Sequence, residues 1–131
     1  MMLAPPITPR LTLRWPYIDA MNGMAKHVAS TTLDGLAWNN SHLIPGDDVA
    51  DGVAALKRRP GQDLVMYGSR DLMHRLQERD LVDEYRILVH PVLLGKGRSL
   101  LDDGAARADL RLVDTTVMPP GVAVLTDHPV R

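Results

Sequence analysis

The chain contains no cysteine and no phenylalanine in its 131 residues. Without cysteine it has neither disulfides nor thiolate metal sites, which is compatible with any reducing compartment. Without phenylalanine, its core must be built from aliphatic side chains and from its seven methionines. A chain of this length predicts one domain that buries about two thirds of its unfolded surface.

A strong net charge and a long apolar run are also missing. The formal net charge is −1, and no basic run is interleaved with aromatic residues, so the sequence does not predict a nucleic-acid partner. No apolar run approaches the length of a membrane span, and residues 1–16 lack the regions of a signal peptide. We therefore expect a cytoplasmic protein that binds neither nucleic acid nor membrane.

One stretch, residues 63–76, organises the chain. Residues 64–67 (Leu-Val-Met-Tyr) form a short apolar run that predicts a buried strand, and the pattern after Ser69 predicts a helix. Gly68 between them lets the main chain approach a ligand, and the helix N-terminus favours an anion. Ser69 is placed to cap the helix or to donate its hydroxyl to a phosphate. From these residues alone, an ordinary strand-to-helix turn is the simpler interpretation.

The remaining pattern predicts an α/β fold with a mixed sheet, flanking helices and parallel strands in the middle. Asp47 or Asp48 is expected to cap the second helix. A type II turn at Pro119-Pro120-Gly121 is expected to close a C-terminal antiparallel hairpin, whose first strand is half-buried. The expected helices are 17–25 and 48–58, and the expected strands are 26–30, 42–44, 85–92, 110–117 and 122–125. Four prolines make residues 1–16 an extended lead, so the domain is residues 17–131.

Two further segments carry groups that suit an anion. Ser30, Thr31 and Thr32 end a predicted strand, where their hydroxyls either contact a phosphate or cap the turn. Residues 94–98 (Leu-Gly-Lys-Gly-Arg) form a glycine-rich loop with two cations but without P-loop spacing. The five histidines show no metal-ligand spacing. No nucleophile–base pair is evident, and the adjacent Asp83 and Glu84 point to opposite faces of a strand. The sequence therefore names no catalytic residue and no metal site.

The chain resembles the dihydrofolate reductase-like family, and within it the RibD C-terminal-domain group, in the segment DLVMYGSRDLMHRL followed by LVDEYRILVHPVLLGKGRSLL. MAKHVASTTL, WNNSHLI, LKRRPGQDL and LRLVDTTVMPPGVAVLT match the same group in the same order. The resemblance covers residues 17–126. The RibD C-terminal-domain group includes the reductase of riboflavin biosynthesis.

The resemblance implies an oxidoreductase that uses NADPH to reduce a pterin or a ribosylaminopyrimidine. It places the cofactor's pyrophosphate at Gly68, Ser69, Arg70 and Asp71, through their backbone N–H groups. It places the adenosine 2′-phosphate at Ser30, Thr31 and Thr32, and the substrate side near Leu94 and Gly95. Many members carry arginine at the position of Thr31, so NADH is an alternative cofactor here. A homodimer is also expected.

The family's first strand and first helix have no counterpart before Tyr17. The Pro-rich residues 1–16 do not supply them, and a missing central strand leaves sheet edges unpaired. Three explanations stay open: an N-terminally truncated sequence, a degenerate member, or a chain completed by a partner subunit. The alternative to a reductase is accordingly a non-catalytic nucleotide-binding or dimerisation module.

Overall fold

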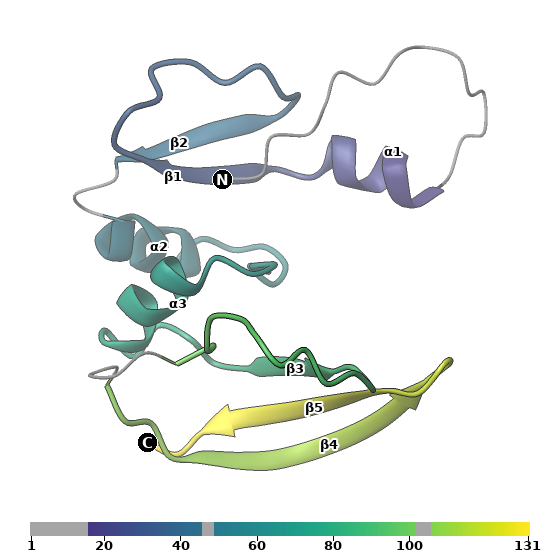
Figure 1. Cartoon of the computed structure of the whole chain (residues 1–131). Helices are drawn as coiled ribbons and strands as arrows, with labels where there is room; N and C mark the ends of the chain where they lie inside the picture. The colour runs from purple at the N-terminus through teal and green to yellow at the C-terminus, as the bar shows by residue number, and fades with distance from the viewer. Residues whose placement is uncertain (1–15, 46–48, 102–105) are drawn as a thin grey trace. The chain divides into compact units, whose positions relative to one another are not determined.

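A computed structural model of the chain describes residues 16–45, 49–101 and 106–131. The chain forms two compact units, Met1–Gly61 and Gln62–Arg131, and each is described by itself. The predicted lead before Pro16 and the predicted caps Asp47 and Asp48 lie outside the described residues. The helices and strands are drawn in Figure 1.

The first unit holds two helices and a pair of parallel strands. Its elements are α1 (Pro16–Gly23), β1 (Lys26–Ser30), β2 (Ser41–Pro45) and α2 (Val49–Lys57). The strands β1 and β2 are in register from Lys26 opposite Ser41 to Ser30 opposite Pro45. All four elements were predicted from the sequence, and their observed bounds differ from the predicted ones by at most two residues.

Lys26 fixes the junction between α1 and β1. Its ammonium donates hydrogen bonds to the carbonyls of Met21, Asn22 and Met24 at 3.0, 3.2 and 2.7 Å. The same nitrogen lies 4.8 Å from the centroid of the Trp38 ring, a cation–π contact. The last carbonyls of a helix receive no hydrogen bond from an N–H group of the same helix. One cation here donates to several of these carbonyls and complements the helix dipole.

The core of the first unit lies where α2 meets β2. Ile44 of β2 and Val49 of α2 are buried, with 8% and 5% of their surfaces exposed. Gly52, in the middle of α2, faces Ile44 at a distance too short for a side chain. This glycine is therefore a packing residue, although glycine is a poor helix former.

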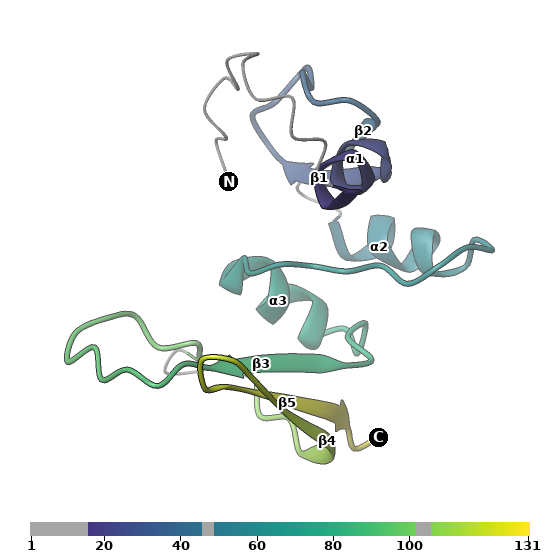
Figure 2. The ribbon, with the colours of Figure 1, turned by 90° about the vertical axis from the view of Figure 1, so that its right-hand side faces the viewer.

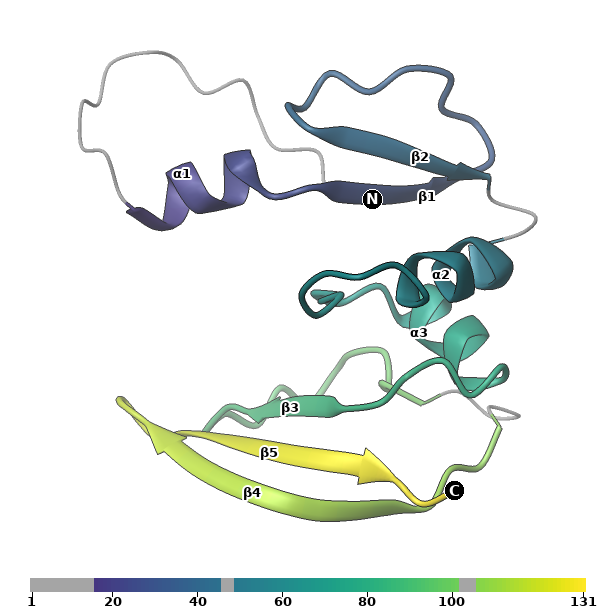
Figure 3. The ribbon, with the colours of Figure 1, turned by 180° about the vertical axis from the view of Figure 1, so that it is seen from behind.

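The second unit combines one helix with a three-stranded antiparallel sheet. Its elements are α3 (Arg70–Gln77), β3 (Tyr85–Val89), β4 (Leu110–Met118) and β5 (Val122–Pro129). The strand order is β3-β5-β4, with β5 in the centre, as Figures 1 and 3 show. The predicted C-terminal hairpin is thus confirmed, and an irregularity in its register lies between Leu112 and Asp114.

Helix α3 ends in a Schellman motif. Leu81 N–H bonds the carbonyl of Leu76 at 2.9 Å, and Asp80 N–H bonds that of Gln77 at 3.0 Å. Asp80 takes the left-handed conformation, with φ of 52°, that glycine more often supplies. Leu76 is the buried residue of this helix. The motif turns the chain so that α3 lies over the sheet of its own unit, as seen in Figure 2.

The predicted buried strand at residues 64–67 is wrong. These residues form no strand, and Leu64, Val65 and Tyr67 are 50%, 66% and 78% exposed. A strand requires a hydrogen-bonded neighbour, and no described strand pairs with this segment. The predicted α/β class is confirmed, with both parallel and antiparallel strands, but the described strands form a parallel pair and an antiparallel three-stranded sheet in place of the single mixed sheet that was expected.

Two details of the hairpin also differ from expectation. Strand β4 is exposed along all nine residues, because it is an edge strand with no described layer over it, so it is not half-buried. The turn is closed by a hydrogen bond of 2.7 Å from Gly121 N–H to the Met118 carbonyl. Pro120 is therefore its third residue, and the Pro119–Pro120 peptide is cis, which makes it a type VI turn and not type II.

Candidate functional site

The Gly68-Ser69 corner opens helix α3 with two left-handed residues. The φ angles are 71° at Gly68 and 64° at Ser69, and a non-glycine residue rarely adopts such an angle. A Cβ added to Gly68 would meet no atom within 4 Å, so the space beside the corner is open. Ser69 occupies the N-cap position, but its side chain makes no capping hydrogen bond. Of the two alternatives predicted for this hydroxyl, capping the helix is therefore not observed, and the contact to a phosphate stays a prediction.

The first hydrogen bond of α3 runs from Met73 N–H to the Ser69 carbonyl, at 3.0 Å. The N–H groups of a first helical turn have no acceptor inside the helix, and they carry the positive end of its dipole. The corner thus presents main-chain donors and one hydroxyl on an open surface. This is an arrangement that binds an anion such as a phosphate.

Arg70 and Asp71, the next predicted site residues, direct their side chains differently. The Arg70 side chain is 15% exposed and that of Asp71 is 85% exposed, with 3.6 Å between Arg70 Nε and Asp71 Oδ1. Arg70 Nη1 donates a hydrogen bond to the carbonyl of Ser99 at 3.3 Å. This bond turns the guanidinium towards Ser99, and the backbone N–H of Arg70 belongs to the first turn of the helix.

Ser30, Thr31 and Thr32 lie in the first unit, at the end of β1, whereas the corner belongs to the second unit. The Ser30 hydroxyl oxygen accepts hydrogen bonds from the N–H groups of Thr32 and Leu33, at 3.2 and 3.1 Å. It therefore caps the turn, which was one of the two predicted alternatives. Thr31 and Thr32 are exposed.

Leu94 and Gly95 lie in the loop that follows β3, in the same unit as the corner. Leu94 is 77% exposed and Leu93 before it is fully exposed. Gly95 has a φ of 68°, which explains why glycine occupies this position. The loop thus offers apolar side chains to a ligand or a partner.

Asp83 and Glu84 act separately, as predicted. Asp83 pairs with Arg131 at 3.0 Å, and Glu84 pairs with Arg86 at 2.7 Å and with His128 at 3.1 Å. The hydrogen bonds from His128 and then Arg86 lower the pKa of the Glu84 carboxyl. These pairs tie the entry of β3 to the end of β5 and form no shared acid–base centre.

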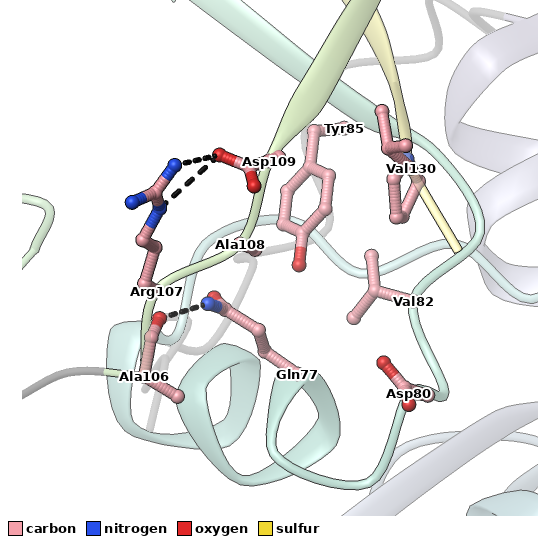
Figure 4. A pocket seen from close by; sticks show the side chains of 10 residues that line it. Gln77, Asp80, Val82, Tyr85, Ala106, Arg107, Ala108, Asp109 and Val130 are labelled. Atoms are coloured by element: carbon pink, nitrogen blue, oxygen red, sulfur yellow. Dashed lines mark hydrogen bonds and ion pairs between the residues drawn. The ribbon is translucent and has the colours of Figure 1, made fainter.

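A small cavity of about 210 Å³ lies between α3 and the start of the sheet (Figure 4). Gln77, Asp80, Val82 and Tyr85 line one side of it, and residues 106–109 line the other. Burial, above all, raises the pKa of the Tyr85 phenol. The sequence pattern did not reveal the cavity, because its walls come from distant segments that share no motif.

No metal centre emerges from the described residues: within them, no three histidine or acidic side chains cluster closely enough to hold an ion. None of the described helices has the length and apolar character needed to cross a membrane.

The sequence profile of the RibD C-terminal domain family matches residues 5–124. The chain belongs to this family. The resemblance found in the sequence is thus confirmed. The uncharacterized protein YyaP of Bacillus subtilis (strain 168) is 34% identical over 103 residues, which are 79% of this chain and 54% of that protein. The chain therefore spans about half the length of this curated relative.

A crystal structure supports the fold of this RibD C-terminal domain. It is that of a protein from Shewanella sp. PV-4 provisionally named a riboflavin biosynthesis protein. The match has a TM-score of 0.64 at 20% identity and covers 92% of this chain and 66% of the other. At this identity the likeness concerns the fold and not the activity.

Proposed function

We propose that this RibD C-terminal domain acts in an NADPH-dependent reduction of a small heterocycle, a pterin or a ribosylaminopyrimidine. Membership of the family supports a reductase-type domain. The observation that carries the proposal is the Gly68-Ser69 corner, where two successive left-handed residues open a helix onto free space. Such backbone is energetically costly outside glycine and is found mostly at functional sites.

The donors of the corner fit the pyrophosphate of a dinucleotide. Main-chain N–H groups at a helix N-terminus and an uncommitted Ser69 hydroxyl are donors that suit phosphate oxygens. Gly68 leaves room for the approach. The exposed carboxylate of Asp71 repels an anion, and the neighbouring Arg70 guanidinium offsets part of that repulsion. In this proposal the phosphate lies on the Gly68 side of the corner.

NADPH, when bound, would supply the hydride, and the chain would supply binding and orientation. The corner would hold the pyrophosphate through the backbone N–H groups of Gly68, Ser69, Arg70 and Asp71. The family resemblance alone assigns Thr31 and Thr32, which are exposed in the first unit, to the adenosine 2′-phosphate. Leu94 and Gly95 would cover the substrate side. We assign no proton donor, because no described residue combines a shifted pKa with a position at the corner.

The proposal is tested by titrating the purified chain with NADPH and with NADH, and by following NADPH oxidation with dihydrofolate or with the ribosylaminopyrimidine precursor of riboflavin. Binding of NADPH with turnover of either substrate supports the reductase. Absence of NADPH binding contradicts the proposal.

Exposed sheet edges favour a second candidate, a non-catalytic module that forms a homodimer. Within the described residues β3 and β4 are edge strands, and β4 carries exposed Leu112, Val113 and Val117. Long, apolar edge strands add strands from other chains. This candidate predicts a dimer by light scattering and NADPH binding without turnover, whereas a monomer would contradict it.

A further inference from the structure

Three side chains on one face of α3 bind main-chain carbonyls of residues 99, 100 and 106. Arg70 Nη1, His74 Nε2 and Gln77 Nε2 lie 3.3, 3.2 and 2.6 Å from the carbonyl oxygens of Ser99, Leu100 and Ala106, respectively. Positions 70, 74 and 77 follow the i, i+4, i+7 spacing of one helix face. We call these three residues the anchoring stripe. His74 is half-buried.

The anchoring stripe binds the chain directly after the glycine-rich loop. After β3 the chain runs back towards α3, as Figures 1 and 3 show, and it reaches the helix at Ser99. Residues 92–98 therefore connect the end of β3 to the position where Ser99 is bound to α3. Within them Gly95 and Gly97 have positive φ angles, and Leu93 is fully exposed.

The residue anchored at the start of α3 lies close in sequence to two cations, Lys96 and Arg98. Arg70 is the first residue of the helix, next to the Gly68-Ser69 corner, and it holds Ser99, the neighbour of Arg98. Neither Lys96 nor Arg98 forms an ion pair with another described residue. Their charges are thus not neutralised by another described side chain.

We propose that the anchoring stripe is a set of positioning residues, which hold Lys96 and Arg98 beside the corner so that they strengthen dinucleotide binding. The inference rests on the proposed function, because it assumes that the corner holds the pyrophosphate. A merely structural stripe would stabilise the loop without affecting cofactor affinity. The two roles are separated by measuring loop opening and affinity on the same variants.

Loop opening is measured by trypsin cleavage after Lys96 and Arg98 in the full chain, followed by mass spectrometry. Proteolysis of a transiently open segment follows its open population. Loss of one hydrogen bond in Gln77→Leu should speed cleavage at these two sites by about 5-fold, and Arg70→Met should have a similar effect. Arg75→Met is the matched control, because Arg75 is an exposed residue of α3 outside the stripe. Unchanged cleavage in both stripe variants overturns the anchoring.

Cofactor affinity is measured by fluorescence titration with NADPH. Gln77→Leu and Arg70→Met should weaken binding by about 5-fold, Arg75→Met should not, and Arg70→Lys should recover part of the loss because it keeps a donor. Arg98→Met should weaken wild-type binding but add little to Gln77→Leu, because the two changes act on one element. Additive effects, or wild-type affinity despite faster cleavage, overturn the positioning role. If the wild-type chain binds no NADPH, the proposed function itself fails, and the cleavage comparison still shows whether the stripe anchors the loop.

Discussion

Gly52 of α2 lies directly against Ile44 of β2. A Cβ on Gly52 would come within 2.5 Å of Ile44 Cγ2, closer than side-chain atoms pack. Gly52→Ala should therefore destabilise the first unit by about 1–3 kcal/mol, despite the better helix propensity of alanine. Urea unfolding measures the change. Gly35→Ala is the control, because a Cβ there meets nothing within 4 Å.

The same contact predicts that a smaller side chain at position 44 restores part of the stability lost in Gly52→Ala. Ile44→Ala creates space beside position 52, so the double variant with Gly52→Ala should be more stable than the sum of the two single changes predicts. Strict additivity of the two free energies would show that the contact does not limit the packing of α2.

Lys26 predicts a second stability effect. Lys26→Met keeps the apolar stem but removes three hydrogen bonds to the end of α1 and the cation over Trp38. We expect a loss of about 1–2 kcal/mol in unfolding free energy, with a changed Trp38 emission. Lys96→Met, at an exposed loop position, is the control. Equal stability of the two variants would contradict the capping role of Lys26.

His27 predicts a dependence of stability on pH. Burial, the charge of His42 and the charge of Arg59 lower the pKa of the His27 imidazole, whose ring stacks on that of His42 at 5.4 Å between centroids. Since the unfolded chain binds this proton at a higher pH than the folded chain, the contribution is present above pH 6.5 and is lost as pH falls through the folded pKa.

His27→Gln should remove this part of the acid sensitivity, seen as a smaller fall in the urea midpoint between pH 7.5 and 5. His90→Gln is the control, because His90 is exposed in the second unit. The same fall in wild type and His27→Gln would rule out His27 as its source.

Thr31 predicts a change in cofactor preference. Many family members carry arginine at this position, and a guanidinium makes charge-assisted contacts to a phosphate. Thr31→Arg should strengthen NADPH binding over NADH binding by about 10-fold. Titration with both cofactors measures the ratio, and Thr31→Gln serves as the uncharged control. An unchanged ratio would remove Thr31 from the 2′-phosphate site.

The local elements were predictable, because their signals lie within short windows. The spacing of apolar residues located α1, α2 and α3, short extended segments located the parallel strands, and the alternation after Leu110 located the hairpin. The sequence could not predict that residues 64–67 have no pairing strand, because an apolar run indicates a tendency to be buried but not the presence of a neighbour that buries it. The anchoring stripe was equally hidden, since its acceptors are main-chain carbonyls, which no sequence pattern marks.

The site was predicted in part. The change from an apolar run to a helical pattern located the Gly68-Ser69 corner. The structure adds the left-handed φ angle of Ser69 and shows that its hydroxyl makes no capping hydrogen bond. The sequence could not predict that the Arg70 side chain is directed to Ser99, a residue 29 positions away. For Ser30 the sequence left two alternatives open, and the structure shows the one in which its hydroxyl oxygen caps a local turn.

The central claim, that the Gly68-Ser69 corner holds the phosphates of NADPH, is tested most directly by comparing Gly68→Asp with Gly68→Asn. Both residues tolerate a positive φ and have nearly the same shape, but only aspartate places a negative charge against the phosphates. The dissociation constant for NADPH is measured for both variants and for the wild type. We predict that the asparagine variant retains measurable binding and that the aspartate variant loses it. Equal affinity of the two variants would contradict the site.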